Sequence, residues 1–135
     1  MPNLKSYKGN MYVADEGTEV IKIVYDFDKD GGSVAAYNGF TAKQKMVVLK
    51  AYMKVQAACT SGGSATVSLG KTGTVAAFTA ATAVASLTSD AIITGVSGLG
   101  AGGVILAADD VVFFDVAVAA LTAGKIEATL IVDKF

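Results

Sequence analysis

Hydrophobic and polar residues alternate along several segments of this 135-residue chain, and the alternation limits the possible folds more than any other feature. The clearest example covers residues 47–57, where apolar side chains occupy every second position. Successive side chains of a β-strand point to opposite faces, so this segment predicts a long strand with one buried face. The predicted inner face holds Val47, Leu49, Ala51, Met53, Val55 and Ala57, and the outer face holds Val48, Lys50, Tyr52, Lys54 and Gln56.

The same pattern predicts further strands along the chain, with weaker ones over residues 33–40, 91–96 and 103–106. Residues 60–64, which contain two glycines, are expected to be a hairpin loop, and residues 121–124 to connect the last two strands as a second hairpin. Residues 75–87 do not alternate and are rich in Ala, so they predict a long connection with a helical turn. The predicted inner faces comprise Ile21, Ile23, Tyr25 and Phe27, then Ala65, Val67 and Leu69, then Val112, Phe114, Val116 and Val118, then Ile126, Ala128, Leu130 and Val132.

About eight strands separated by turn signals predict an all-β chain folded as a single antiparallel β-sandwich. Residues 1–17 carry no periodicity and are expected to form an extended N-terminal arm, followed by the sandwich domain over residues 18–135. This length fits one domain with a core of its own.

Charge is nearly absent from residues 57–107, where only Lys71 and Asp90 are charged. Thr, Ser and Gly interrupt every apolar run well short of the ~20 residues needed to cross a bilayer, so no membrane partner is expected. The alternation allows one side of each strand to fill a core, while small polar side chains cover the other side. Removing water from such a surface costs little free energy. We therefore interpret the uncharged segment as a surface for assembly that surrounds a core.

The composition argues against several classes of function. Net charge is −1 and all 11 basic residues are Lys, so a nucleic-acid partner is not expected. The chain has no His, which removes the commonest general base and metal ligand, and we expect neither an enzyme nor a cofactor. Cys59 lies among apolar residues and predicts a buried, inert thiol, and Asp109 and Asp110 predict a turn at a strand start. The first 17 residues have no apolar core and do not predict a signal peptide.

Three segments partly match ligand-binding motifs. Residues 65–72 end in the GKT of a phosphate-binding loop, and residues 98–103 spell GxGxxG, but both lack the required context and are expected to be coincidences. Asp26, Asp28 and Asp30 match the first half of a calcium loop, whose twelfth position holds Tyr37 in place of an acid. A solvated turn is the preferred interpretation, and a bound divalent cation is the alternative.

Aromatic residues on predicted outer faces are candidates for a subunit interface, where aromatics are enriched. Phe113 is expected to share a face with Asp115. Val48 and Tyr52 are expected to lie on the face of residues 47–57 that also carries Lys50 and Lys54. The alternative is that the arm or neighbouring loops cover them. Charged and aromatic arm residues can contact a neighbour, and the candidate interface residues are Lys5, Tyr7, Tyr12, Val48, Tyr52 and Phe113.

Three stretches, TSGGSATVSLG, AAFTAATAVASLT and LAADDVVFFDVAVAALTAGKIEATLIV, together resemble head decoration, or cement, proteins of tailed bacteriophages. The resemblance covers about residues 45–132 and implies a jelly-roll-like sandwich. It also implies a virion protein, made in the host cytoplasm, that binds the major capsid protein on the outside of the head as a homotrimer and stabilises the shell. No interface residue of that family can be assigned here. A phage tail or fibre domain that binds a receptor or carbohydrate is the alternative, although the chain has no Trp to bind a sugar.

Overall fold

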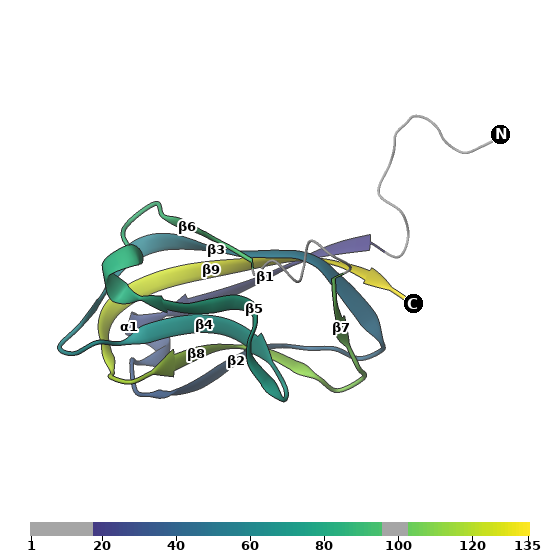
Figure 1. The fold of residues 1–135 in the computed structure, drawn as a ribbon, viewed down its shortest axis with the longest axis horizontal. Coiled ribbons are helices and arrows are strands. Elements are labelled where there is room, and N and C mark those ends of the chain that lie inside the picture. The colour runs from purple at the N-terminus through teal and green to yellow at the C-terminus, as the bar shows by residue number, and fades with distance from the viewer. Residues whose placement is uncertain (1–17, 96–102) are drawn as a thin grey trace.

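The computed structural model describes residues 18–95 and 103–135, most of which lie in two antiparallel β-sheets packed face to face (Figure 1). The arm candidates Lys5, Tyr7 and Tyr12 fall outside the described residues. Sheet A has the order β1–β9–β3–β6 with β7 also paired to β3, and sheet B has the order β2–β8–β4–β5. Sheet A consists of β1 (Thr18–Asp26), β3 (Met46–Ser61), β6 (Ile92–Thr94), β7 (Val104–Leu106) and β9 (Leu121–Lys134). Sheet B consists of β2 (Ala35–Thr41), β4 (Thr66–Lys71), β5 (Thr74–Ala83) and β8 (Val111–Ala117).

The connections give the fold a jelly-roll topology, which confirms the predicted all-β sandwich. The chain passes from one sheet to the other at almost every step, and only β4 and β5 are consecutive neighbours in one sheet. Strands β6 and β7 pair with different parts of β3, so together they act as one interrupted edge strand, and nine strands replace the predicted eight or so. Residues 18–95 and 103–135 also contain two short helical segments, α1 (Phe27–Asp30) and η1 (Val84–Ser86). No helix in the described part of the chain is long and apolar enough to span a bilayer.

Both predicted hairpins are wrong, because each pair of consecutive strands lies in different sheets. Residues 62–65 carry the chain from β3 in sheet A to β4 in sheet B, and residues 118–120 carry it from β8 back to β9. The predicted connection at residues 121–124 belongs to β9 itself. The two crossovers lie side by side, since the Ser61 hydroxyl donates to the Ala120 carbonyl at 2.7 Å. A turn signal marks a chain reversal but does not say which sheet receives the next strand.

The prediction of a long connection over residues 75–87 is wrong for most of its length, which is the edge strand β5, but the predicted helical turn is present as η1. The pairing of β5 with β4 shifts register twice, from Val67–Thr82 to Leu69–Thr79 and then to Lys71–Thr74. The extra residues remove the period-two alternation that identifies a strand from its sequence. Thr79 is fully buried, and its hydroxyl accepts a hydrogen bond from the Leu69 amide at 3.0 Å. This bond gives the backbone amide a partner where the register shifts.

The prediction that Val48 faces outward with Tyr52 is wrong as well. Val48 pairs with Val132, whereas Lys50 pairs with the adjacent Ile131, so Leu49 is an extra residue in β3. This β-bulge exchanges the two faces of the strand. Val48 is therefore fully buried, while Leu49 is 45% exposed despite its predicted inward position. Ala57, also predicted to face inward, is exposed beside a second register shift.

The core fills the space between the sheets with the predicted inner faces of most strands. The β9 residues Ile126, Ala128, Leu130 and Val132 are fully buried, as predicted. In β8 the prediction holds except at its last position, since Val118 lies beyond the strand and is 74% exposed. The largest fully buried side chains are Tyr25, Phe78, Phe114, Met53 and Leu69.

Candidate assembly surface

The outer face of sheet A, meaning the face turned away from the core, gathers most of the large apolar side chains exposed on the described part of the chain. It is formed by β1, β9 and β3, with β6 and β7 at its edge. Soluble monomers rarely expose large contiguous apolar patches, and such patches commonly mark interaction sites. Five of the nine exposed large apolar residues lie on this face, namely Val20, Val24, Leu49, Ile92 and Ile105.

The strand register arranges this face in rows that cross the sheet. One row runs through Val24, Glu127, Lys54 and Ile92, so that two exposed apolar residues flank two charged ones. The next row runs through Lys22, Thr129, Tyr52 and Thr94. Side chains in one row are close enough to interact across the strands. The candidate Tyr52 is half-buried at the centre of this face.

Glu127 forms ion pairs with two lysines of this face, Lys22 and Lys54. Its carboxylate lies 3.3 Å from the Lys54 ammonium and 4.0 Å from the Lys22 ammonium. The Glu127 side chain is 15% exposed, against 43% for Lys54 and 56% for Lys22. Ion pairs this exposed contribute at most about 1 kcal/mol each to stability. A partner that covered this part of the face would meet Glu127 already paired with two lysines.

Thr129, which lies one row from Glu127, is a buried polar residue whose hydroxyl has no hydrogen-bond partner in the described part of the chain. Thr129 is 4% exposed. It lies between Lys22 on β1 and Tyr52 on β3 in the register. An unsatisfied buried hydroxyl costs about 1–3 kcal/mol, so this face carries a small penalty at its centre.

The outer face of sheet B differs, because the chain itself covers part of it. Ser68 is 2% exposed although its predicted position is outward, and its hydroxyl donates to the Val75 carbonyl of β5 at 3.2 Å. The β5 backbone also lies so close to Gly70 that a Cβ there would be 1.9 Å from the Val75 oxygen. The candidate Phe113 pairs with Gly70 and is half-buried on this face. The structure therefore places Tyr52 and Phe113 on opposite faces of the sandwich and does not bring them together.

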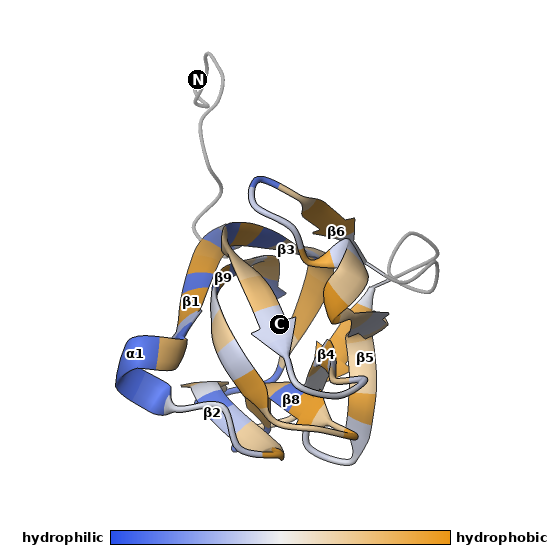
Figure 2. Cartoon of the chain, turned by 90° about the vertical axis from the view of Figure 1, so that its left-hand side faces the viewer, coloured by the Kyte–Doolittle hydropathy of each residue, from blue (hydrophilic) through white to orange (hydrophobic). Residues whose placement is uncertain are grey.

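Charge is distributed unevenly around the sandwich. Hydrophilic residues concentrate at α1, whereas β4, β5 and β6 are mainly apolar or neutral (Figure 2). The uncharged segment of residues 57–107 supplies β4, β5, β6 and β7, which include the edge strands on one side of both sheets. The opposite edge strand of sheet A, β1, carries Glu19, Lys22 and Asp26. Charged edge strands resist pairing with other chains, and neutral ones lack this protection.

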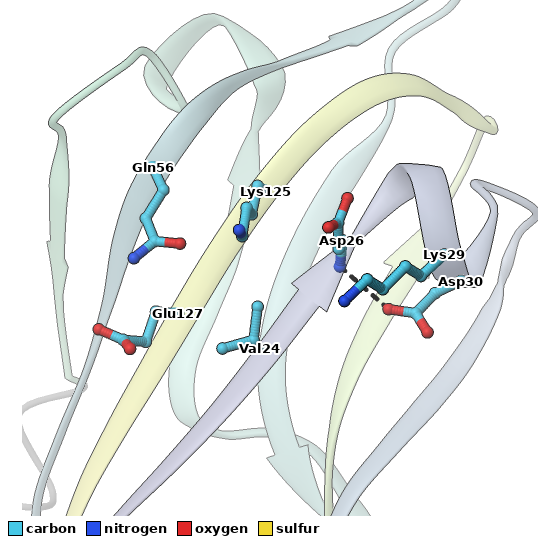
Figure 3. A pocket seen from close by; sticks show the side chains of 7 residues that line it. All are labelled: Val24, Asp26, Lys29, Asp30, Gln56, Lys125 and Glu127. Atoms are coloured by element: carbon cyan, nitrogen blue, oxygen red, sulfur yellow. Dashed lines mark hydrogen bonds between the residues drawn. The ribbon is translucent and has the colours of Figure 1, made fainter.

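A polar cavity of about 460 Å³ lies where α1 meets the outer face of sheet A (Figure 3). Two of the three acidic residues of the calcium hypothesis, Asp26 and Asp30, line this cavity, and their carboxylates bond to backbone amides in and beside α1. The Asp26 carboxylate accepts a hydrogen bond from the Asp28 amide at 3.1 Å, and Asp30 accepts one from the Asp26 amide at 3.0 Å. In residues 18–95 and 103–135, no three acidic, His or Cys side chains are placed to hold a metal ion. The cavity is lined by Val24, Asp26, Lys29, Asp30, Gln56, Lys125 and Glu127.

The remaining candidate groups for chemistry have structural roles. Cys59 is buried, and burial raises the pKa of its thiol from 9.0 to about 11, so the reactive thiolate is scarce at neutral pH. Asp109 occupies a turn with φ of 74°, and Asp110 accepts a hydrogen bond from the Ala107 amide at 3.0 Å. Lys71 of the GKT sequence ends β4 and lies 3.8 Å from the Asp110 carboxylate. Most of the GxGxxG sequence, residues 98–102, lies outside the described residues.

No protein-family model matches the sequence, and no curated protein matches it either. The fold, in contrast, is similar to chains in three solved capsid structures. The first, from the capsid of Ralstonia phage GP4, has a TM-score of 0.68 at 12% identity and covers 96% of this chain and 92% of the other.

The other two likenesses are of the same kind. A chain of the acidic stable capsid structure of Helicobacter pylori bacteriophage KHP30 has a TM-score of 0.62 at 15% identity, covering 89% of this chain and 90% of the other. A chain of the cyanophage Pam1 capsid asymmetric unit has a TM-score of 0.62 at 17% identity, covering 99% and 98%. At these identities the likeness establishes the fold: this chain has a jelly roll similar, over nearly its whole length, to chains of three phage capsids.

Proposed function

We propose that this protein is a non-enzymatic structural component of a phage virion, and specifically a decoration or cement module that binds the outside of the head and stabilises the shell. The likeness to chains of three phage capsids carries the virion role. The resemblance of the sequence to head decoration proteins adds the position on the outside of the head. In each case the likeness covers at least 89% of both chains, so it extends over nearly the whole of each chain rather than one part of it.

The outer face of sheet A supports an assembly role independently of the comparisons. It presents exposed Val, Leu and Ile side chains around paired charges. Burial of apolar area stabilises an interface by roughly 25 cal/mol per Å². Because Glu127 is already paired with lysines, burying its charge in an interface costs less free energy than burying an unpaired carboxylate. We assign this face to contacts with the major capsid protein or with other copies of this chain. A homotrimer is the oligomer we propose, because the resemblance to head decoration proteins implies it, and a closed ring of this kind leaves no free interface.

The test uses purified protein and phage shells that lack it, with co-sedimentation to measure binding and light scattering to measure oligomer mass. Ile92→Asp places a charge on the outer face of sheet A, where Ile92 is 54% exposed. Val34→Asp is the matched control, because Val34 is 56% exposed and lies outside that face. We expect wild-type protein and the Val34 variant to form trimers that bind shells. The Ile92 variant should lose at least tenfold in affinity for shells or for itself, which is about 1.4 kcal/mol.

A monomer that ignores such shells would contradict the decoration role. If the protein instead bound saccharides reproducibly in a glycan screen and left shells untouched, the tail or fibre alternative would replace it. Equal behaviour of the Ile92 and Val34 variants, with wild-type binding intact, would leave the decoration role standing but remove sheet A as the contact surface.

A further inference from the structure

One groove of the sandwich lies directly beside the start of β1. Its volume is about 280 Å³, slightly below the range of about 300–1,000 Å³ typical of small-molecule sites. Phe40 is half-buried there, and Met46 is also part of the wall. This size suits one or two side chains of a peptide rather than a separate ligand. The groove is lined by Glu19, Phe40, Thr41, Lys43, Gln44, Met46 and Lys134.

The charges of the groove are only partly paired. Lys134 lies 3.2 Å from the Glu19 carboxylate. Lys43 is exposed and forms no ion pair with any residue that the structure describes. A peptide with an apolar or aromatic side chain next to one or two carboxylates would therefore complement this groove.

The chain itself carries such a peptide just before β1. Residues 11–13 are Met-Tyr-Val, residues 15–16 are Asp-Glu, and Gly17 directly precedes the first residue of β1. Tyr12 is six residues before Thr18, so it can reach at most about 20 Å from the start of the strand. Glu19, the second residue of that strand, already lines the groove. Glycine at position 17 tolerates the backbone reversal that a return to the groove requires.

We infer that residues 11–16 dock into this groove of the same chain, with Tyr12 against Phe40 and Met46 and an acidic residue opposite Lys43. The same chain is favoured over a neighbouring copy because the connection is short. Closing a loop of so few residues costs little entropy, and a short tether gives an effective concentration in the millimolar range. The inference concerns the isolated protein and does not depend on the virion role.

The chain has no Trp, so Tyr12→Trp in the full-length protein provides a single fluorescent reporter. Docking predicts an emission maximum at shorter wavelength than that of a Val34→Trp control, whose position is 56% exposed. The shift should not change on dilution. Adding Thr41→Arg, which fills the groove from an exposed position, should return the emission to that of the control, whereas adding Thr74→Arg at an exposed position outside the groove should not.

Three results would overturn the inference. Emission equal to that of the Val34 control would show that Tyr12 is not docked. A shift that disappears on dilution would assign the groove to another copy of the chain, and a shift insensitive to Thr41→Arg would place Tyr12 elsewhere. Should the Trp variant fold poorly, Tyr12→Ala with amide chemical-shift mapping tests the same contact, with changes expected at residues 41–46 and absent if the segment does not dock.

Discussion

The β-bulge at Leu49 leads to a sharp prediction, because two adjacent residues exchange their expected roles. Val48→Ala removes two methyl groups from a fully buried site. At about 0.8 kcal/mol for each buried carbon the transfer loss is about 1.6 kcal/mol, and the cavity left behind raises the total to about 2–3 kcal/mol. Leu49→Ala removes three carbons from a side chain that is 45% exposed, and no closed cavity results. Its cost should be at most about 1 kcal/mol.

Urea unfolding followed by circular dichroism measures both values, and thermal unfolding gives an independent estimate. At about 4 °C for each kcal/mol in a domain of this size, the midpoint should fall by about 10 °C for the Val48 variant and by at most about 4 °C for the Leu49 variant. Uninterrupted alternation along β3 predicts the reverse order, since a buried Leu→Ala costs about 2–5 kcal/mol. A larger loss for Leu49→Ala than for Val48→Ala would refute the bulge and the assignment of faces in this part of β3.

Further predictions follow from buried polar groups and from the acidic turn. Thr129→Val removes a hydroxyl that has no hydrogen-bond partner among the described residues, at nearly constant volume, so the free energy of unfolding should rise by about 1–3 kcal/mol. A lower free energy of unfolding would mean that the hydroxyl is hydrogen-bonded. Burial raises the pKa of Cys59 to about 11 and that of Tyr25 to about 12. Because the unfolded chain releases these protons first, stability should fall as pH rises from about 9 to 12, and a flat profile in buffered melts would contradict this. Adding a chelator should leave the melting midpoint unchanged, because Asp26 and Asp30 bond to backbone amides; a lower midpoint would restore the calcium hypothesis.

The period-two pattern predicts the fold class and many inner faces, because a strand with one buried face must alternate. It succeeds along β9, where pairing with β1 is regular, and fails in β3 and β5 where register shifts insert extra residues. Bulges depend on how a strand contacts its partner, so the pattern of one strand alone does not reveal them. The same limit explains the two wrong hairpins, since the choice between pairing and crossing over is made by the whole sandwich.

The candidate surface is less visible in the sequence than the fold. Tyr52 is predicted to face outward, but its neighbours on the outer face of sheet A come from four other strands. Glu127 and its lysine partners are 73 and 105 residues apart in the chain, and only the register places them together. The uncharged segment points to a neutral side of the sandwich, whereas the apolar patch of sheet A also draws on β1 and the start of β3.

Electron cryomicroscopy of phage shells saturated with the protein tests the central claim most directly. The account predicts threefold density for this jelly roll on the outside of the head, with the outer face of sheet A in contact with the shell or a neighbouring copy. Density on the tail, no bound density on the head, or a bound molecule with this face turned to solvent would contradict it.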